Sequence, residues 1–317
     1  MRHSAYKIAE PILTLNGSPR ELELLDLLRR YDLLPSDFIF KATGNYHATR
    51  TLLTRLTKGG YIGFPNLPHQ EKLAYIPRNA NYVYELKPKG AAMLALKDRW
   101  RTRTRGNDHF KHKLLRSKVE FSLDHAGLRA LFPEDILAHP NCPRETREDP
   151  FPWRITGSRP LLAPDITRGF AHNGSFAFLH VEVDRGTEPE ETQNERQSIC
   201  AKLSRYQTYL SEKVYFRRYG LTGAPTVLFF TINNNRKERI KKHARKYPHA
   251  RFAFTCVPNF DADTQVLTTW ETLEGSVNLM EILGANNGHA TSTRPSCAPR
   301  RADERGVESR FRNGVAV

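Results

Sequence analysis

The 317-residue sequence has few cysteines and no long hydrophobic run. Its four cysteines are far apart and form no C-x-x-C pair, which argues against a disulfide scaffold or a thiolate zinc site and fits a reducing compartment. The longest clearly apolar run, 227–230, is far shorter than the roughly 20 residues that a membrane-spanning helix needs. The N-terminus lacks the apolar segment of a secretory signal. We therefore expect a cytoplasmic protein with no membrane partner.

Acidic residues are few relative to basic ones. The chain has 49 Lys and Arg against 34 Asp and Glu, a formal net charge of +15. Such an excess favours a polyanionic partner, with double-stranded DNA the leading candidate, because each neutralised phosphate releases a counterion. A basic surface with no dedicated partner would have the same composition. Charge alone therefore favours nucleic acid without establishing it.

The composition divides the chain into five segments. Residues 1–19 form a polar, flexible lead-in, and residues 20–98 form a small α+β unit. A basic hinge at 99–108 separates this unit from a larger α/β unit at 109–283. Residues 284–317 are rich in Asn, Gly, Ser, Thr, Pro and Arg, which predicts a disordered basic tail. The length also fits about two domains.

The first unit has the element order of a winged helix-turn-helix. Apolar spacing predicts helices near 22–31, 36–42 and 47–58, with Ser36 as the N-cap of the second. Short extended runs follow at 61–63, 73–76 and 82–86, and a last helix is expected at 91–96. Three helices followed by a β-ribbon therefore predict a winged helix.

The third of these helices has a polar and basic face. The residues expected to point away from its apolar stripe are His47, Thr49, Arg50, Thr51, Thr54, Arg55 and Lys58. Arginine can pair with guanine edges, and threonine can contact phosphates or the thymine methyl group, so this face suits the major groove. Arg101 and Arg103 of the hinge and the basic helix at 236–246 would contact phosphates. Alternatively, this face is only solvated and the unit dimerises or docks a partner.

The second unit begins with a helix expected over 108–128, on which His109 and His112 are three residues apart. Since no third ligand follows at metal spacing, a cap, or a DNA-facing or structural role, is favoured for the two histidines. Strand alternation in the run 176–184 then separates polar from apolar residues. One face holds His180, Glu182 and Asp184, and the other holds Leu179, Val181 and Val183.

Asp165 is predicted to join this polar face. A turn over 169–174 predicts a hairpin, which would bring Asp165 and Glu182 onto one site. Aligned acidic groups are costly to bury unless they bind or pair with a cation. Oxygen-rich clusters suit Mg²⁺ or Mn²⁺, which can activate water against a phosphodiester. Downstream, a helix at 198–210, a strand at 224–231, the basic helix and a strand at 251–255 predict an α/β sheet.

Several of these motifs resemble a known family. Pro164-Asp165, the strand Glu182-Val183-Asp184 and the helix with Lys202 and Tyr206 resemble the core of the PD-(D/E)XK nuclease superfamily. Together with the winged helix, His112-Lys113-Leu114 and the run Glu182–Thr187, they are similar to the replication-relaxation family over most of residues 20–250. That family is associated with plasmid and mobile-element DNA, in replication, relaxation and mobilisation. The resemblance implies an α/β protein (α+β overall), with an N-terminal winged helix-turn-helix followed by a PD-(D/E)XK-like α/β sheet domain.

The resemblance also implies site residues. Asp165 and Glu182 would be the carboxylates that hold Mg²⁺ or Mn²⁺, with Glu120 on the preceding helix as a third. The lysine usual two residues after the acid is replaced here by Asp184, and an anion cannot steady a hydroxide nucleophile. Lys202 could supply the missing cation from its helix. The catalytic candidates are therefore Asp165, Glu182, Asp184 and Lys202.

Two functions remain open at this stage. In the first, the chain nicks DNA with a divalent metal or helps to load a relaxase or a replication initiator. In the second, it is a non-catalytic winged-helix regulator of transcription or replication, whose second domain serves dimerisation, as a homodimer, or partner docking. Asp184 and Arg185 would then form an ordinary ion pair and Lys202 would be solvated. The two functions differ in their dependence on a metal.

Overall fold

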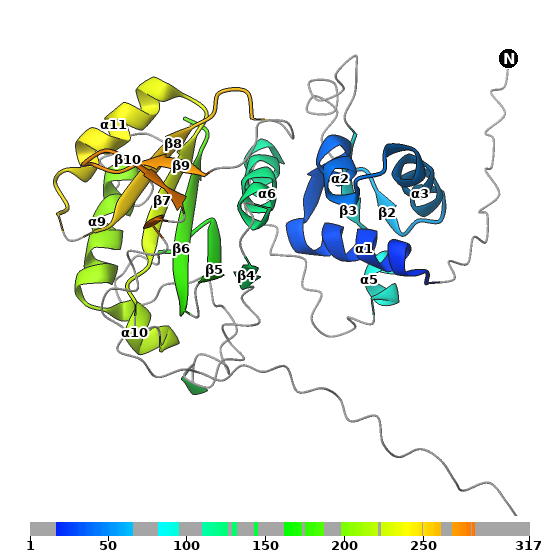
Figure 1. Ribbon diagram of the computed structural model, residues 1–317, viewed down its shortest axis with the longest axis horizontal. Coiled ribbons are helices and arrows are strands. Elements are labelled where there is room, and N and C mark those ends of the chain that lie inside the picture. Colours follow the sequence, from blue (N-terminus) through cyan, green and yellow to red (C-terminus); the bar gives the residue numbers. More distant parts are fainter. Residues whose placement is uncertain are drawn as a thin grey trace, which may run out of the picture.

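The structure, a computed structural model, describes residues 17–65, 82–94, 110–125, 129–131, 143–144, 162–172, 175–186, 198–220, 223–248, 250–260, 268–279 and 281–282. These residues form eight helices and two sheets, so the predicted mixed α/β class is confirmed (Figure 1). None of the helices in these ranges combines the length and the hydrophobicity that crossing a membrane requires.

The N-terminal part is a small helical unit with a three-stranded sheet. Its elements are α1 (Pro19–Tyr31), β1 (Leu33–Pro35), α2 (Ser36–Thr43), α3 (Tyr46–Lys58), β2 (Ile62–Gly63), β3 (Val83–Leu86) and α5 (Pro88–Met93). The strand order is β1-β3-β2, and both pairs are antiparallel. The first three expected helices and the runs at 61–63 and 82–86 are therefore present. The last helix, expected at 91–96, begins earlier, because α5 starts at Pro88. The run at 73–76 lies outside the described residues.

One local prediction in this unit was wrong, and one strand was missed. Pro35, not Ser36, is the N-cap of α2, and the three residues before α2 form the unexpected strand β1. This strand pairs with β3, whose residues lie about fifty positions later in the sequence, so local spacing could not reveal it. The start of α3 follows familiar rules. Gly44 adopts a φ of 67° after α2, and the Asn45 side chain accepts a hydrogen bond from the Ala48 amide at 3.0 Å.

The second part is built on a seven-stranded mixed sheet. Its elements are α6 (Phe110–Asp124), β4 (Arg129–Leu131), β5 (Ile166–His172), β6 (Ser175–Asp184), α9 (Ile199–Ser211), α10 (Val214–Tyr219), β7 (Thr226–Thr231), α11 (Asn234–Ala244), β8 (Phe252–Cys256), β9 (Thr269–Glu271) and β10 (Ser276–Asn278). The strand order is β10-β9-β8-β7-β6-β5-β4. Strands β6, β7 and β8 run parallel, and the flanking pairs are antiparallel.

Two further expectations needed correction here. The helix expected over 108–128 is shorter, because α6 ends at Asp124 and β4 begins at Arg129. The hairpin expected around a turn over 169–174 exists, but β5 continues to His172, which pairs with Ser175. The strands are therefore longer and the turn tighter than the glycines suggested.

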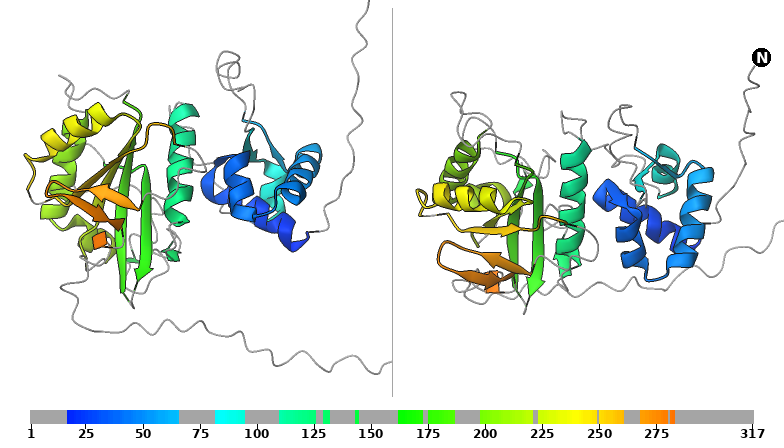
Figure 2. Two further views of the ribbon diagram at one scale, coloured as in Figure 1. Left: turned by 45° about the horizontal axis from the view of Figure 1, so that its top comes forward. Right: turned by 90° about the horizontal axis from the view of Figure 1, so that it is seen from above.

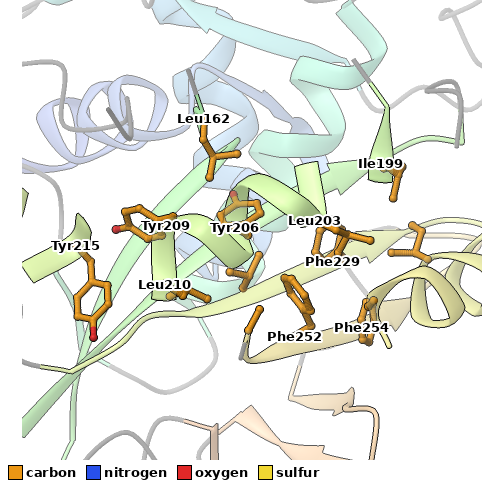
Figure 3. Packing of buried hydrophobic residues seen from close by; sticks show 14 of the residues in the cluster. Leu162, Ile199, Leu203, Tyr206, Tyr209, Leu210, Tyr215, Phe229, Phe252 and Phe254 are labelled. Atoms are coloured by element: carbon orange, nitrogen blue, oxygen red, sulfur yellow. The ribbon is translucent and has the colours of Figure 1, made fainter. Parts of the chain in front are cut away.

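Helices cover both faces of this sheet. Leu203, Tyr206 and Tyr209 of α9 pack with Phe229 and Phe254 on one face (Figure 3). On the other face, side chains of α6 pack with the apolar residues that alternate along β6. Each large apolar side chain buried in this way stabilises the fold by about 1.5–3 kcal/mol. The alternation predicted for β6 is confirmed, since its polar face is turned toward α9 and α11.

Helix α6 lies between the two sheets (Figures 1 and 2). The Phe121 ring of α6 packs in the core of the N-terminal unit, with its centroid 5.3 Å from those of both Tyr31 and Phe38. The Tyr31 hydroxyl donates a hydrogen bond to Asp124 at 3.0 Å. One helix therefore contributes to both hydrophobic cores.

Candidate nucleic-acid interface and acidic site

Six side chains of α3 line one open concavity. They are His47, Arg50, Thr51, Thr54, Arg55 and Lys58, and all six residues are exposed. We call these six residues the α3 surface. Leu53 and Leu56 of the same helix are buried in the core, so the apolar spacing of the helix decides which residues face outward.

Not every residue expected on this face is there. Thr49 is buried, and its hydroxyl lies 2.7 Å from that of Thr43, so its assignment to the exposed face was wrong. Arg55 forms an ion pair with the buried Glu21 of α1, although its side chain remains 47% exposed. Within the described residues, Arg50 and Lys58 have no acidic group at ion-pair distance. These two cations are therefore the most available on the α3 surface.

The other residues expected to contact phosphates belong to the hinge and to α11. Arg101 and Arg103 lie outside the described residues. Helix α11 was expected to present its basic residues from Arg236 onward, but Arg236 and Lys237 are buried. The Arg236 guanidinium donates to Asp184 at 2.7 Å, and Lys237 pairs with Glu271. The exposed basic residues of this segment are Arg239, Lys242, Arg245 and Lys246.

A second cluster forms where β5 begins beside the end of β6. Ile166 pairs with Val181, so Asp165, one residue earlier, is level with Glu182 across the two strands. The Asp165 Oδ2 accepts the Val183 amide hydrogen at 2.8 Å, and its Oδ1 lies 3.1 Å from Nε2 of His112. The structure therefore brings together the two carboxylates that the sequence paired.

Helix α9 completes this cluster from the side of the sheet that Glu182 faces. Lys202 Nζ donates to Glu182 Oε2 at 2.9 Å, and the Tyr206 hydroxyl donates to Glu182 Oε1 at 2.6 Å. We call His112, Asp165, Glu182, Lys202 and Tyr206 the acidic site. Glu182 is almost fully buried, whereas the side chains of His112, Asp165 and Lys202 are 19%, 18% and 21% exposed. The site therefore reaches the surface through these three side chains.

The surroundings of Glu182 and Asp165 shift the pKa values of their carboxyls in opposite directions. Burial raises the pKa of Glu182, and the nearby charge of Asp165 adds to this, while Lys202 opposes it. Burial also acts on Asp165, but the hydrogen bond with His112 and the charge of Lys202 hold the pKa of Asp165 below its ordinary value. Burial raises the pKa of Tyr206, which keeps its hydroxyl protonated. Two carboxyls separated in this way suit one to stay ionised and the other to exchange a proton.

The donor set of the acidic site can be tested against a divalent metal. No group of three or more His, Cys, Asp or Glu side chains in the described ranges is arranged to hold a metal ion. Asp165 and Glu182 nevertheless provide two carboxylates at one site. Mg²⁺ is usually held by one or two carboxylates and completed by water and substrate phosphates. Two carboxylates do not form a closed protein cage, so a metal here would need water and substrate phosphates as its other ligands.

The structure does not bring Glu120 or Asp184 to this site. The carboxylate of Glu120 is paired with Arg168, which is level with Leu179 and so faces α6, on the side of the sheet opposite Glu182. Asp184 accepts hydrogen bonds from Arg236 and from the Gly186 amide. The alternative ion pair of Asp184 with Arg185 was therefore wrong, because the buried carboxylate is neutralised by Arg236.

Sequence reasoning missed the role of His112. It was set aside because no further ligand follows at metal spacing along its helix, yet its partner, Asp165, lies 53 positions later. His109 lies outside the described residues. The only clue in the sequence was that His112-Lys113-Leu114 belonged to the motifs of the resemblance.

His180 also lies on the polar face of β6, and its burial should make the stability of the fold depend on pH. Its ring is buried between the hydroxyls of Thr167 and Tyr209, and burial lowers its pKa to about 3. The unfolded chain protonates His180 near pH 6.5, whereas the folded chain keeps the buried ring neutral. The free energy of unfolding is therefore highest above about pH 6.5 and falls as the pH drops below that value. In urea unfolding, the wild type should lose about 2 kcal/mol more than His180→Gln between about pH 7.5 and about pH 5.

The exposed His47 provides the control for this measurement. His47→Gln makes the same substitution at an exposed position of α3 and should leave the difference between the wild type and His180→Gln unchanged. Equal pH dependence in all three proteins would contradict the buried neutral state of His180.

The geometry defines a class of protein: an exposed basic helix surface in one unit, and a buried acid–lysine site on the mixed sheet of the next. The chain belongs to the replication-relaxation family, whose sequence model matches residues 25–224, from within α1 to just before β7. This range contains both the α3 surface and the acidic site. No curated protein and no solved structure matches the chain significantly. Membership confirms the resemblance and supports a role related to plasmid or mobile-element replication.

Proposed function

We propose that this protein binds duplex DNA through the α3 surface. The observation that carries the proposal is that one helix exposes Arg50, Arg55 and Lys58 together with threonine hydroxyls, around a single concavity. An α-helix fits the major groove, where arginine pairs bidentately with guanine and lysine contacts phosphates. Membership in the replication-relaxation family and the net charge of +15 support the same partner.

The proposed DNA binding also implies a cellular compartment and a protein partner. Plasmid and mobile-element DNA lies in the cytoplasm, a reducing compartment that suits a chain with four widely spaced cysteines. A relaxase or a replication initiator is the protein partner that such a role would call for. The exposed basic residues of α11 would contact phosphates farther along the duplex.

Removing the two available cations of the α3 surface tests DNA binding. We expect Arg50→Ala with Lys58→Ala to weaken binding of a labelled duplex about 10- to 100-fold, because a bidentate pairing of arginine with a base is worth about 1–3 kcal/mol and the lysine adds a phosphate contact. Fluorescence anisotropy measures the dissociation constants. The control, Lys213→Gly with Arg217→Ala, removes the same charge from two exposed positions, the N-cap of α10 and its last turn, and glycine suits the positive φ of residue 213. Equally weakened binding in both variants, or wild-type binding in both, would count against the α3 surface.

A second candidate function is metal-dependent nicking of DNA at the acidic site. The observation that favours it is the 2.9 Å contact of Lys202 Nζ with Glu182, because Lys202 supplies a cation beside this carboxylate although the lysine usual two residues after the acid is absent. Asp165 and Glu182 would hold Mg²⁺ or Mn²⁺, which when bound lowers the pKa of water and neutralises phosphate charge. Lys202 would stabilise the negative charge that develops on the phosphate. His112 orients Asp165, and Tyr206 orients Glu182.

Supercoiled plasmid distinguishes nicking from regulation. A nuclease should convert it to open circles with Mg²⁺ or Mn²⁺ and leave it intact in EDTA. A regulator without catalysis should bind the duplex equally in both conditions and cut in neither. That second result would reject the nicking function and leave DNA binding untouched.

A further inference from the structure

Two exposed aromatic rings lie side by side at the two ends of the β2–β3 connection. Phe64 follows β2 and Tyr82 precedes β3, and they are 50% and 56% exposed. Their centroids are 5.4 Å apart, and the buried Tyr84 supports Phe64 from beneath at the same separation. We call Phe64 and Tyr82 the aromatic pair. Contiguous exposed rings mark an interaction site more often than isolated ones do.

Lysines contact the segment that joins the α3 surface to the aromatic pair. Lys89 Nζ donates to the carbonyl oxygen of Gly59 at 2.9 Å, directly after the exposed Lys58 that ends α3. Within the described ranges, neither Lys58 nor Lys89 has an acidic group at ion-pair distance. Lys87 Nζ donates to the carbonyl oxygen of Phe64 at 3.2 Å, although Glu85 offsets its charge. These contacts place Lys58, Lys89 and Lys87 along residues 58–64, the segment that joins the end of α3 to Phe64.

We propose that the aromatic pair is a stacking platform for unpaired bases of single-stranded DNA, with Lys58 and Lys89 on the phosphates. This inference rests on the proposed DNA-binding function and adds the single-stranded form as a ligand. Every base has a π face, so stacking on Phe and Tyr is tolerant of sequence, and adjacent cations follow the backbone. The cations favour a polyanion over a second copy of this chain. A stable dimer would also need to bury far more area than two rings provide.

The ring dependence of single-strand binding tests this inference. The probes are a labelled oligothymidylate of about 20 nucleotides and a labelled duplex, each titrated by anisotropy. We expect Phe64→Leu with Tyr82→Leu to weaken oligothymidylate binding at least about tenfold and to leave duplex binding unchanged, because leucine is apolar but has no π face. Phe64→Tyr with Tyr82→Phe keeps both rings and should bind like the wild type.

Phe216 provides the matched control, since it is 52% exposed on α10, away from the aromatic pair in sequence. Phe216→Leu should leave oligothymidylate binding unchanged. Undiminished binding by the double leucine variant would overturn the inference, and so would a change from dimer to monomer with unchanged binding, which would make the pair an interface between copies. Wild type that binds duplex but not oligothymidylate rejects this inference alone. Wild type that binds neither rejects the proposed function as well.

Discussion

Lys202→Met is expected to lower the rate of metal-dependent plasmid nicking at least about 100-fold, because removing one group that stabilises transition-state charge costs about two to three orders of magnitude. The ammonium of Lys202 lies 2.9 Å from Glu182 and also acts on the charge of Asp165. Methionine keeps the length of the side chain without its charge. The time course of open-circle formation in Mg²⁺ measures the effect.

Two further variants test whether nicking depends on the positive charge at residue 202 in particular. Lys202→Arg keeps a cation and should retain part of the activity, although its planar group does not match the ammonium. Lys111→Met removes one exposed positive charge from α6 and should nick at the wild-type rate. Duplex affinity should be equal in all four proteins, since the α3 surface is unchanged. If Lys202→Met nicked plasmid at the wild-type rate, Lys202 would have no part in the reaction.

Arg168→Met is expected to destabilise the fold by about 3–5 kcal/mol, because removing one partner of a buried ion pair leaves uncompensated charge. The Arg168 guanidinium pairs with Glu120 and donates to Asp124 at 3.0 Å, and all three side chains are almost fully buried. Asp124 also accepts the hydrogen bond from Tyr31 of the N-terminal unit. The substitution therefore removes the positive charge from the buried cluster at which α6 contacts both cores.

Urea unfolding followed by fluorescence measures this destabilisation. Burial already raises the pKa of Asp124 with Arg168 present, so the destabilisation should be smaller at about pH 5 than at about pH 8, where the carboxyls cannot take up protons as readily. Arg30→Met, which removes an exposed partner of Asp26, should cost no more than about 1 kcal/mol. Adding Glu120→Gln and Asp124→Asn to Arg168→Met should restore much of the stability. Equal effects of Arg168→Met and Arg30→Met would contradict this description of the cluster.

Periodicity alone predicted much of both candidate sites. The apolar stripe of α3 identified its exposed face, and alternation along β6 placed Glu182 opposite Val181 and Val183. The hairpin argument brought Asp165 level with Glu182, because antiparallel pairing fixes register over a short span. These successes share one cause: the contacts depend on residues close in sequence.

The errors arise where distant residues decide the outcome. Arg236 lies in the first turn of a helix rich in basic residues, yet Asp184 binds it inside the protein, because a buried carboxylate needs a counter-charge. Glu120 was expected near Asp165, but Arg168 holds it on the other side of the sheet. His112 was discounted although Asp165 reaches it. In each case the partner is more than forty positions away, which composition and spacing cannot reveal.

The salt dependence of duplex binding tests the central claim, DNA binding through the α3 surface, most directly. The logarithm of the association constant should fall linearly with the logarithm of salt concentration, with a slope of about 0.9 for each phosphate neutralised. We predict that Arg50→Ala with Lys58→Ala lowers both the affinity and this slope, by about one to two phosphate contacts. A wild-type slope that these substitutions leave unchanged would contradict the account, because the DNA would then be bound elsewhere.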